Sequence, residues 1–438
     1  MNRPASVSLP TALRYWLKLG FISFGGPAGQ IAMMHAELVE KRRWISEKRF
    51  LHALNYCMVL PGPEATQLAI YIGWLLHKTR GGIAAGLLFI LPSLGILIGL
   101  SWVYLVYGKL PLVAAILYGI KPAVVALVLA ACKRIAARAL NNRWLMLIAL
   151  GALLALAVFD LPFPTVVLGA AVLGWLGGRL APDKFRPGAA HQATQASYGP
   201  ALIDDDTPPP AHARFSWLKL IAILAAGIAI GIASWAALAG GLGLGSPLTQ
   251  MGQFFGKAAL LTFGGAYAVL PYVVQGAVEQ GHWLTPAQMM DGLALGETTP
   301  GPLIMIVTYV GFLGGWQTAS GAPLWPALAG AVVATFFTFL PSFVFVLAGG
   351  PLVEATRDDV HLTAPLTAIS AAVVGVIASL ALFFARHVFH LDAAWRHWDY
   401  AAMLICAAAL LAMLRFQLDA IKTLFACAAA GLVVSYLV

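Results

Sequence analysis

Two clusters of glycine and proline could build an anion-binding site, and they occur in the same order in each half of the chain. The first holds Phe24-Gly25-Gly26-Pro27 and Pro61-Gly62-Pro63, and the second holds Phe263-Gly264-Gly265 and Pro300-Gly301-Pro302. Proline breaks a helix and is favoured at the first position of the next one. Each cluster therefore predicts two interrupted helices. The new helix starts carry unpaired N–H groups and about half a positive charge, which suits an anion.

Residues in and beside these interruptions are the candidate ligands. Glycine lets a ligand approach the backbone closely, and hydroxyl side chains add donors. The expected substrate-binding residues are Ser23, Gly25, Gly26, Pro61, Gly62, Pro63, Lys257, Thr262, Gly264, Gly265, Thr298, Thr299, Pro300, Gly301 and Pro302. The alternative is that these glycines and prolines only allow close packing and kinking of membrane helices. Four interruptions in one repeated register favour a substrate site.

Charged residues near the interruptions have two interpretations. Lys18 and Lys257, each six residues before a Phe-Gly-Gly, are candidate cationic ligands or gates, and Lys121 is a further candidate. Each lysine can instead extend its ammonium group to the membrane surface. Glu64 and Glu297 flank the Pro-Gly-Pro turns and are candidates for proton coupling, because carboxylates inside membranes often relay protons. Glu64 can also act only as a helix cap.

The constant spacing of these landmarks indicates a tandem duplication. Trp44 and Trp283 keep the same register, and Leu91-Pro92-Ser93 matches Leu340-Pro341-Ser342 after a small shift. The predicted units are a first repeat over residues 1–180, a disordered cytoplasmic linker over 181–214, an extra transmembrane helix over 215–240 and a second repeat over 241–438.

Composition predicts a membrane protein. Hydrophobic residues make up 60% and charged residues 10% of the 438 residues. Runs such as 83–107 and 112–132 are long enough to cross about 30 Å of hydrocarbon as helices. We therefore expect an all-α polytopic membrane protein. The four cysteines lack metal or redox spacing and no Ser/His/Asp set is discernible, so we expect no enzyme, no cofactor, no metal and no nucleic-acid partner.

Charge bias predicts how the repeats are oriented. Loop 41–49 holds five Lys or Arg, whereas the matching segment 279–288 holds none. Positive loops stay in the cytoplasm, so the two repeats are expected to be inverted, with broken helices meeting near the membrane midplane. The N-terminus and linker would be cytoplasmic and the C-terminus periplasmic. Segment 386–396 fits less well, because it would be periplasmic and carries two arginines.

The segments on either side of Pro61-Gly62-Pro63 are each about half the length of a membrane span. Residues 50–60 and 64–76 are expected to enter the membrane and return as a re-entrant hairpin, which keeps the basic residues at both ends on one side. A single kinked span is the alternative.

This repeated frame resembles the chromate ion transporter family in its long, two-domain form. The motif residues that carry the resemblance are Phe24, Gly25, Gly26, Pro27, Trp44, Pro61, Gly62 and Pro63, and in the second copy Phe263, Gly264, Gly265, Trp283, Pro300, Gly301 and Pro302. The second copy departs from the pattern at Ala266, which stands where the first copy has Pro27.

The resemblance implies an inner-membrane carrier that exports chromate and confers chromate resistance, coupled to protons or to counter-anion exchange. The alternatives are an oxyanion channel or a transporter of sulfate or molybdate, since all of these ions are tetrahedral dianions. The expected partners are the oxyanion and the lipid bilayer, and a homodimer is left open.

Overall fold

The protein is a bundle of helices. The computed structural model describes residues 4, 6–24, 26–108, 110–185, 198–208, 210–263, 266–317, 324–355, 363–391 and 397–437. Within these ranges the regular structure is helical, apart from one isolated β-bridge between Ile45 and Ile203. Six of the described helices are long and apolar enough to cross a membrane. The expected all-α polytopic membrane protein is confirmed.

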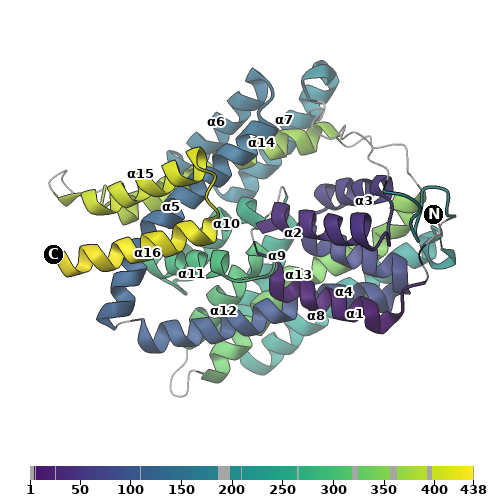
Figure 1. Cartoon of the computed structure of the whole chain (residues 1–438), viewed down its shortest axis with the longest axis horizontal. Coiled ribbons are helices and arrows are strands. Elements are labelled where there is room, and N and C mark those ends of the chain that lie inside the picture. The colour runs from purple at the N-terminus through teal and green to yellow at the C-terminus, as the bar shows by residue number, and fades with distance from the viewer. Residues whose placement is uncertain are drawn as a thin grey trace.

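The first parts of the two repeats have the same order of elements (Figure 1). The first copy forms α1 (Leu9–Ile22), α2 (Gly26–His35), the π-helical turn η1 (Ala36–Lys41), α3 (Glu47–Val59) and α4 (Glu64–Tyr107). The second forms α9 (Pro247–Leu261), α10 (Ala266–Val274), the π-helical turn η5 (Gln275–Gln280), α11 (Pro286–Thr298), η6 (Leu303–Met305), α12 (Ile306–Gln317) and α13 (Leu324–Ala355). Elements η1 and η5 start 239 residues apart, at 36 and 275, and so do α3 and α11, at 47 and 286.

Local sequence sets the limits of α3 and α11. The Ser46 hydroxyl accepts a hydrogen bond from the Arg49 N–H at the start of α3, and Thr285 forms a reciprocal capping box with Gln288 at the start of α11. Both helices end just before a Pro-Gly-Pro turn, where proline removes the donor that a further turn of helix would need.

Helix α3 and the beginning of α4 form a helical hairpin. Arg49, near the start of α3, and Tyr71, in α4, both bond the carboxylate of Glu354, so the chain has folded back between them. Helix α4 then reverses at His77 and Lys78, whose backbone angles are not helical. In the second copy, the Tyr309 hydroxyl of α12 donates to the Gln288 carbonyl of α11. This folding back favours the hairpin over a single kinked span.

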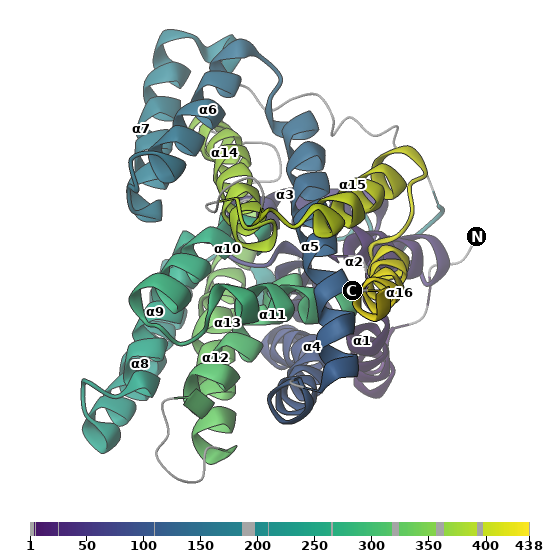
Figure 2. The ribbon, with the colours of Figure 1, turned by 90° about the vertical axis from the view of Figure 1, so that its left-hand side faces the viewer.

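The last helices of each repeat pack on the other repeat. Helices α6 (Arg143–Ala157) and α7 (Phe163–Leu180) pack against α14 (Thr363–Val388), whereas α15 (Tyr400–Arg415) and α16 (Ala420–Leu437) pack against α5 (Pro111–Ala139) (Figures 1 and 2). Helix α8 (Trp217–Leu242) packs on α9 and α13 and exposes most of its apolar surface. The two repeats therefore pack together as a single bundle and do not form separate domains.

Part of the expected disordered linker is ordered. Residues 202–203 pair with the extended backbone at 43–46: the Ile203 N–H donates to the Trp44 carbonyl at 3.0 Å, and the Ser46 N–H donates to the Ile203 carbonyl at 3.0 Å. The extended backbone between η1 and α3 cannot pair its N–H and C=O groups within a helix, and the linker pairs with several of them. Average composition did not reveal this short pairing segment. Residues 186–197 lie outside the described residues.

Replacing either repeated tryptophan with alanine should destabilise the fold. Trp44 and Trp283 are each 4% exposed, and their rings pack at 5.5 Å from those of Tyr15 and Phe254, respectively. We expect Trp44→Ala and Trp283→Ala each to cost about 3–5 kcal/mol of stability. Thermal unfolding of the detergent-solubilised protein measures this. Trp325→Ala is the control, because Trp325 is 77% exposed; an equal loss in all three variants would contradict the assignment.

Candidate functional site

The interruptions of the two repeats meet and bond each other. The Gly62 N–H donates to the Thr262 carbonyl at 2.7 Å, and the Gly301 N–H donates to the Ser23 carbonyl at 3.0 Å. Each bond joins the Pro-Gly-Pro turn of one copy to the Phe-Gly-Gly interruption of the other. Ser23 and Thr262 are 239 residues apart, and so are Gly62 and Gly301, so the two bonds are equivalent. We call this region the crossing.

The crossing needs glycine at the centre of both Pro-Gly-Pro turns. Gly62 and Gly301 have φ angles of +130° and +103°, which side chains rarely allow. A Cβ atom on Gly301 would lie 2.6 Å from the Cβ of Ser93, and one on Gly62 would collide with the hydroxyl of Ser342. The Leu-Pro-Ser segment of each copy thus packs against the Pro-Gly-Pro turn of the other.

Several buried polar side chains around the crossing lack a hydrogen-bond partner. Ser23, Ser93 and Ser342 are at most 1% exposed, and their hydroxyls have no partner within the described part of the chain. The same holds for the Thr66 hydroxyl and for the side-chain oxygens of Gln30 and Gln67. Buried polar groups are nearly always bonded, so a group of unsatisfied hydroxyls marks a place suited to a polar ligand.

Backbone and amide groups complete this surface. Pro63 occupies the N-cap of α4 without a side-chain cap, so the first N–H groups of that helix lack this partner. The Gln30 amide donates to the Gly301 carbonyl at 2.6 Å, and the Gln67 amide donates to the Pro61 carbonyl at 2.8 Å. From the sequence, Gln67 could line the cavity or only form a hydrogen bond between helices; Gln30 was not among the expected residues, because a single polar residue in an apolar helix gives no distinctive signal.

The expected threonine donors are used within their own helices. The hydroxyls of Thr262, Thr298 and Thr299 donate to the carbonyls of Ala258, Leu295 and Gly296, respectively. The N–H groups of Gly62 and Gly301 are likewise taken by the crossing itself. Pro302 is the N-cap of η6, as Pro63 is of α4, while Pro61 and Pro300 open their turns. Gly26 starts α2 with φ +70°, and Gly25, Gly264 and Gly265 lie outside the described residues.

The expected lysines lie at different places. Lys18 on α1 and Lys257 on α9 are exposed, and they share their faces with the exposed apolar side chains of Phe21 and Leu260, respectively. Lys121 on α5 forms an ion pair with the buried Asp291 at 3.8 Å. Within the described residues, none of these three lysines forms a hydrogen bond or an ion pair with Ser23, Gly62, Thr262 or Gly301.

Two arginines of α5 act on the glutamates of the Pro-Gly-Pro turns. Arg134 and Arg138 are exposed and four residues apart, so they lie on one face of the helix. Arg134 lies close enough to Glu297, and Arg138 to Glu64, for their charges to interact, and α5 packs on α11. Glu297 also accepts a hydrogen bond from the Tyr267 hydroxyl. The sequence analysis did not single out these arginines, because it could not show where α5 ends relative to the turns.

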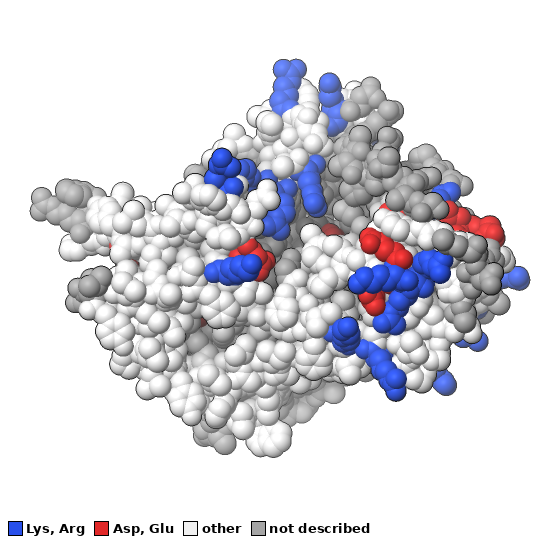
Figure 3. Space-filling view, in the orientation of Figure 1, with Lys and Arg blue, Asp and Glu red and all other residues white. Residues whose placement is uncertain are grey.

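Lys and Arg side chains gather around a depression in the middle of the face that Figure 3 shows. A cation-lined depression concentrates anions near it. The charge on this face is therefore of the sign that an anion site needs.

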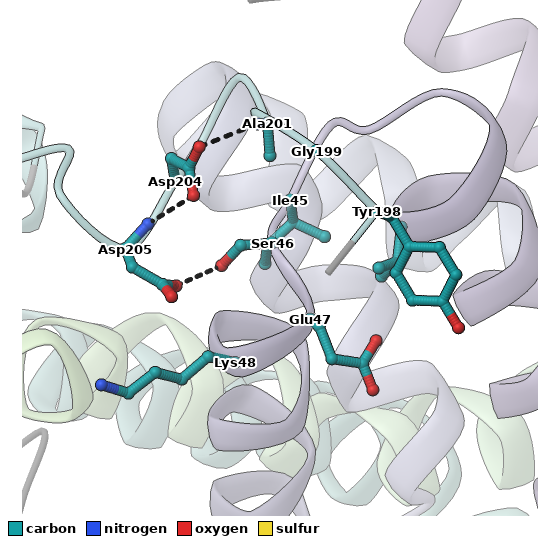
Figure 4. A pocket seen from close by; sticks show the side chains of 10 residues that line it. Ile45, Ser46, Glu47, Lys48, Tyr198, Gly199, Ala201, Asp204 and Asp205 are labelled. Carbon is teal, nitrogen blue, oxygen red and sulfur yellow. Dashed lines mark hydrogen bonds between the residues drawn. The ribbon is translucent and has the colours of Figure 1, made fainter. Parts of the chain in front are cut away.

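A separate cavity lies where the linker meets α3 (Figure 4). Its volume is about 170 Å³, and its lining includes Ser46, Glu47 and Asp205, with the Ser46 hydroxyl donating to Asp205 at 2.6 Å. The linker makes a further contact with α4, where the His212 ring bonds the Trp74 carbonyl at 2.9 Å, and burial lowers the pKa of His212. The acidic lining suits the attachment of the linker and does not suit an anion.

The sequence matches a known family over both repeats. Residues 11–175 and 249–432 match the chromate transporter family. The chain belongs to this family. Its relatives include a chromate transport protein of Pseudomonas aeruginosa, 35% identical over 87% of this chain and 82% of its own length. A chromate transport protein of Cupriavidus metallidurans is 28% identical over 86% and 83% of the two chains.

A third relative has the same identity as the second. A probable chromate transport protein of Synechococcus elongatus is 28% identical over 87% of this chain and 86% of its own length. No solved structure matches the chain. Each of the two segments that match the family contains one Phe-Gly-Gly and one Pro-Gly-Pro. The crossing therefore lies within the part of the chain that matches the family.

Alanine at Gly62 should disrupt the crossing. A residue with a side chain at this positive φ costs about 1–2 kcal/mol, and the added Cβ collides with Ser342. We expect Gly62→Ala and Gly301→Ala each to lower anion transport at least about tenfold while the protein still reaches the membrane. Gly296→Ala is the control, because its Cβ would meet nothing closer than 3.7 Å. Normal transport by Gly62→Ala would show that the tight turn is dispensable.

Proposed function

We propose that this protein is a secondary active transporter that exports chromate across the inner membrane and thereby confers chromate resistance. The observation that carries the proposal is the crossing, where two equivalent hydrogen bonds join the interrupted helices of both repeats beside unsatisfied buried hydroxyls. Membership of the chromate transporter family supports chromate as the substrate.

In this proposal the two repeats are antiparallel in the membrane and alternate access to the crossing. The charge difference between loop 41–49 and segment 279–288 supports this orientation. The two termini lie at opposite ends of the molecule in Figure 1, as expected if the N-terminus and linker are cytoplasmic and the C-terminus is periplasmic. Irregular backbone is tolerated at membrane depth only where it is buried or lines a wet cavity, and the crossing meets that condition.

The dianion would be bound by donors and nearby cations. The hydroxyls of Ser23, Ser93 and Ser342 and the start of α4 supply hydrogen-bond donors. Arg134 and Arg138 supply positive charge, a role that arginine suits because its planar fork matches oxyanions. Glu64 and Glu297 remain the candidates for proton coupling: protonation of either carboxylate would remove a negative charge near the arginines and so favour the anion.

An oxyanion channel, or a transporter of sulfate or molybdate, is the second candidate. Hydroxyl and N–H donors recognise the negative charge of an anion and the tetrahedral arrangement of its oxygen atoms. Chromate, sulfate and molybdate share both properties. Flux that saturates and responds to an imposed ion gradient favours the carrier, and ohmic current in bilayers favours the channel.

Uptake of labelled chromate into inverted membrane vesicles tests the proposed function directly. We expect saturable uptake that depends on an imposed proton gradient or on a trans counter-anion. Excess sulfate and molybdate measure selectivity in the same assay. Vesicles that contain the protein but take up chromate no faster than empty ones would refute the proposal.

Loss of positive charge on one face of α5 should weaken anion binding. We expect Arg134→Gln and Arg138→Gln each to raise the KM for chromate about tenfold, the effect of losing about 1.4 kcal/mol of binding. Lys133→Gln is the matched control, since this exposed lysine on the same helix loses the same charge. Lys257→Met tests the competing assignment. A large effect of Lys257→Met without an effect of either arginine variant would return the cationic role to Lys257.

A further inference from the structure

One face of α3 packs on the end of α13 through polar contacts. Arg49 forms an ion pair with Glu354 at 2.5 Å, and Tyr71 donates to the other oxygen of the same carboxylate at 2.6 Å. His52 bonds the Val353 carbonyl at 3.2 Å. Arg49 and Glu354 are 8% and 7% exposed. This group, the first lock, joins the hairpin of the first repeat to the long helix of the second.

The other hairpin has an equivalent contact with the first repeat. Asp291 lies 239 residues after His52, and Tyr104 lies 249 residues before Val353, which are the spacings of the two halves of the repeat. The Tyr104 hydroxyl donates to Asp291 at 2.9 Å, and Lys121 forms its ion pair with the same carboxylate. Asp291 is 3% exposed. This group, the second lock, joins α11 to α4 and α5.

The two locks lie on opposite sides of the crossing. In Figure 1, α3 lies toward the N-terminal end of the molecule, whereas α11 lies toward the end that carries the C-terminus. Arg49 lies near the start of α3 and Asp291 near the middle of α11, and each helix ends just before the Pro-Gly-Pro turn of its hairpin. Movement of a hairpin away from its lock would expose the crossing toward the end of the molecule on which that lock lies.

We propose that Arg49–Glu354 and Lys121–Asp291 are the two gates of the transporter, one toward each face of the membrane, and that they open in alternation. This inference rests on the proposed function and adds the residues that control access. The Arg49–Glu354 pair is buried, and in the Lys121–Asp291 pair the carboxylate is 3% and the lysine 29% exposed. Breaking such a pair leaves a buried charge uncompensated, which makes the open and closed states distinct. The register of the repeats relates Asp291 to His52 and Tyr104 to Val353, so the two locks lie at related places although their ion pairs use different positions.

Charge exchange tests whether each lock acts as a pair. We expect Arg49→Glu, Glu354→Arg, Lys121→Asp and Asp291→Lys each to lower chromate transport at least about tenfold. The double variants R49E/E354R and K121D/D291K should recover at least about a third of normal transport. Glu37→Gln is the control, because it breaks the part-exposed Glu37–Arg42 ion pair outside both locks. Full transport by any single lock variant would overturn the role of that pair.

Sidedness of access distinguishes a gate from a structural ion pair and does not require transport. In a variant whose native cysteines are replaced with serine, Ser23→Cys places one thiol at the crossing, and a membrane-impermeant maleimide reports access in vesicles of either orientation. We expect Glu354→Gln to raise labelling about tenfold from the face that carries loop 41–49. Asp291→Asn should raise it from the opposite face.

The outcomes separate this inference from the proposed function. Sided labelling of the Ser23→Cys variants, together with no chromate flux through the protein that keeps Ser23, would keep the gates and refute chromate as the substrate. Chromate flux with labelling unchanged, or raised from one face by both variants, would refute the gates. Thermal unfolding of each purified variant identifies a misfolded protein, and the gentler Glu354→Gln and Asp291→Asn variants then carry the test.

Discussion

The structure depends on two reciprocal backbone hydrogen bonds, Gly62 to Thr262 and Gly301 to Ser23. Interrupted helices leave N–H and C=O groups unpaired, and an unpaired backbone group in an apolar interior is costly. Each repeat supplies what the other lacks: the turn of one copy donates to the interruption of the other. Neither copy satisfies these groups by itself, so the arrangement needs two copies that face each other.

The same requirement explains where the polar side chains lie. Close approach of the two copies at the crossing requires glycine in the turns and brings Ser93 and Ser342 against them. The unsatisfied hydroxyls of Ser23, Ser93 and Ser342 are buried in the same place. Such a site offers neutral hydrogen-bond donors, namely hydroxyl and N–H groups. Neutral donors hold an anion less tightly than a fixed positive charge would, which suits a ligand that must bind and then leave. The arginines of α5 add charge from one side, near the carboxylates that can oppose it.

Exchange of helices between the repeats has a consequence for motion. Helices α6 and α7 pack on α14, and α15 and α16 pack on α5, so the outer helices hold the two copies together. The hairpins contact the opposite repeat through polar groups, such as Arg49–Glu354 and Tyr104–Asp291, and also through apolar packing, such as that between the rings of Tyr104 and Tyr309. Motion of a hairpin must therefore break buried polar contacts and rearrange apolar ones.

The sequence by itself determined the helical membrane class, the duplication and the positions of the interruptions, because these depend on local properties: apolar runs, proline, glycine and constant spacing. The structure starts α3 at Glu47, before the predicted segment 50–60, because the Ser46 side chain caps the helix. Only the tertiary structure decided which polar groups stay unsatisfied, that Thr262, Thr298 and Thr299 bond their own helices, and that Arg134 and Arg138 act on Glu297 and Glu64. Those facts depend on contacts between residues far apart in the chain, and no local pattern records which distant groups will meet.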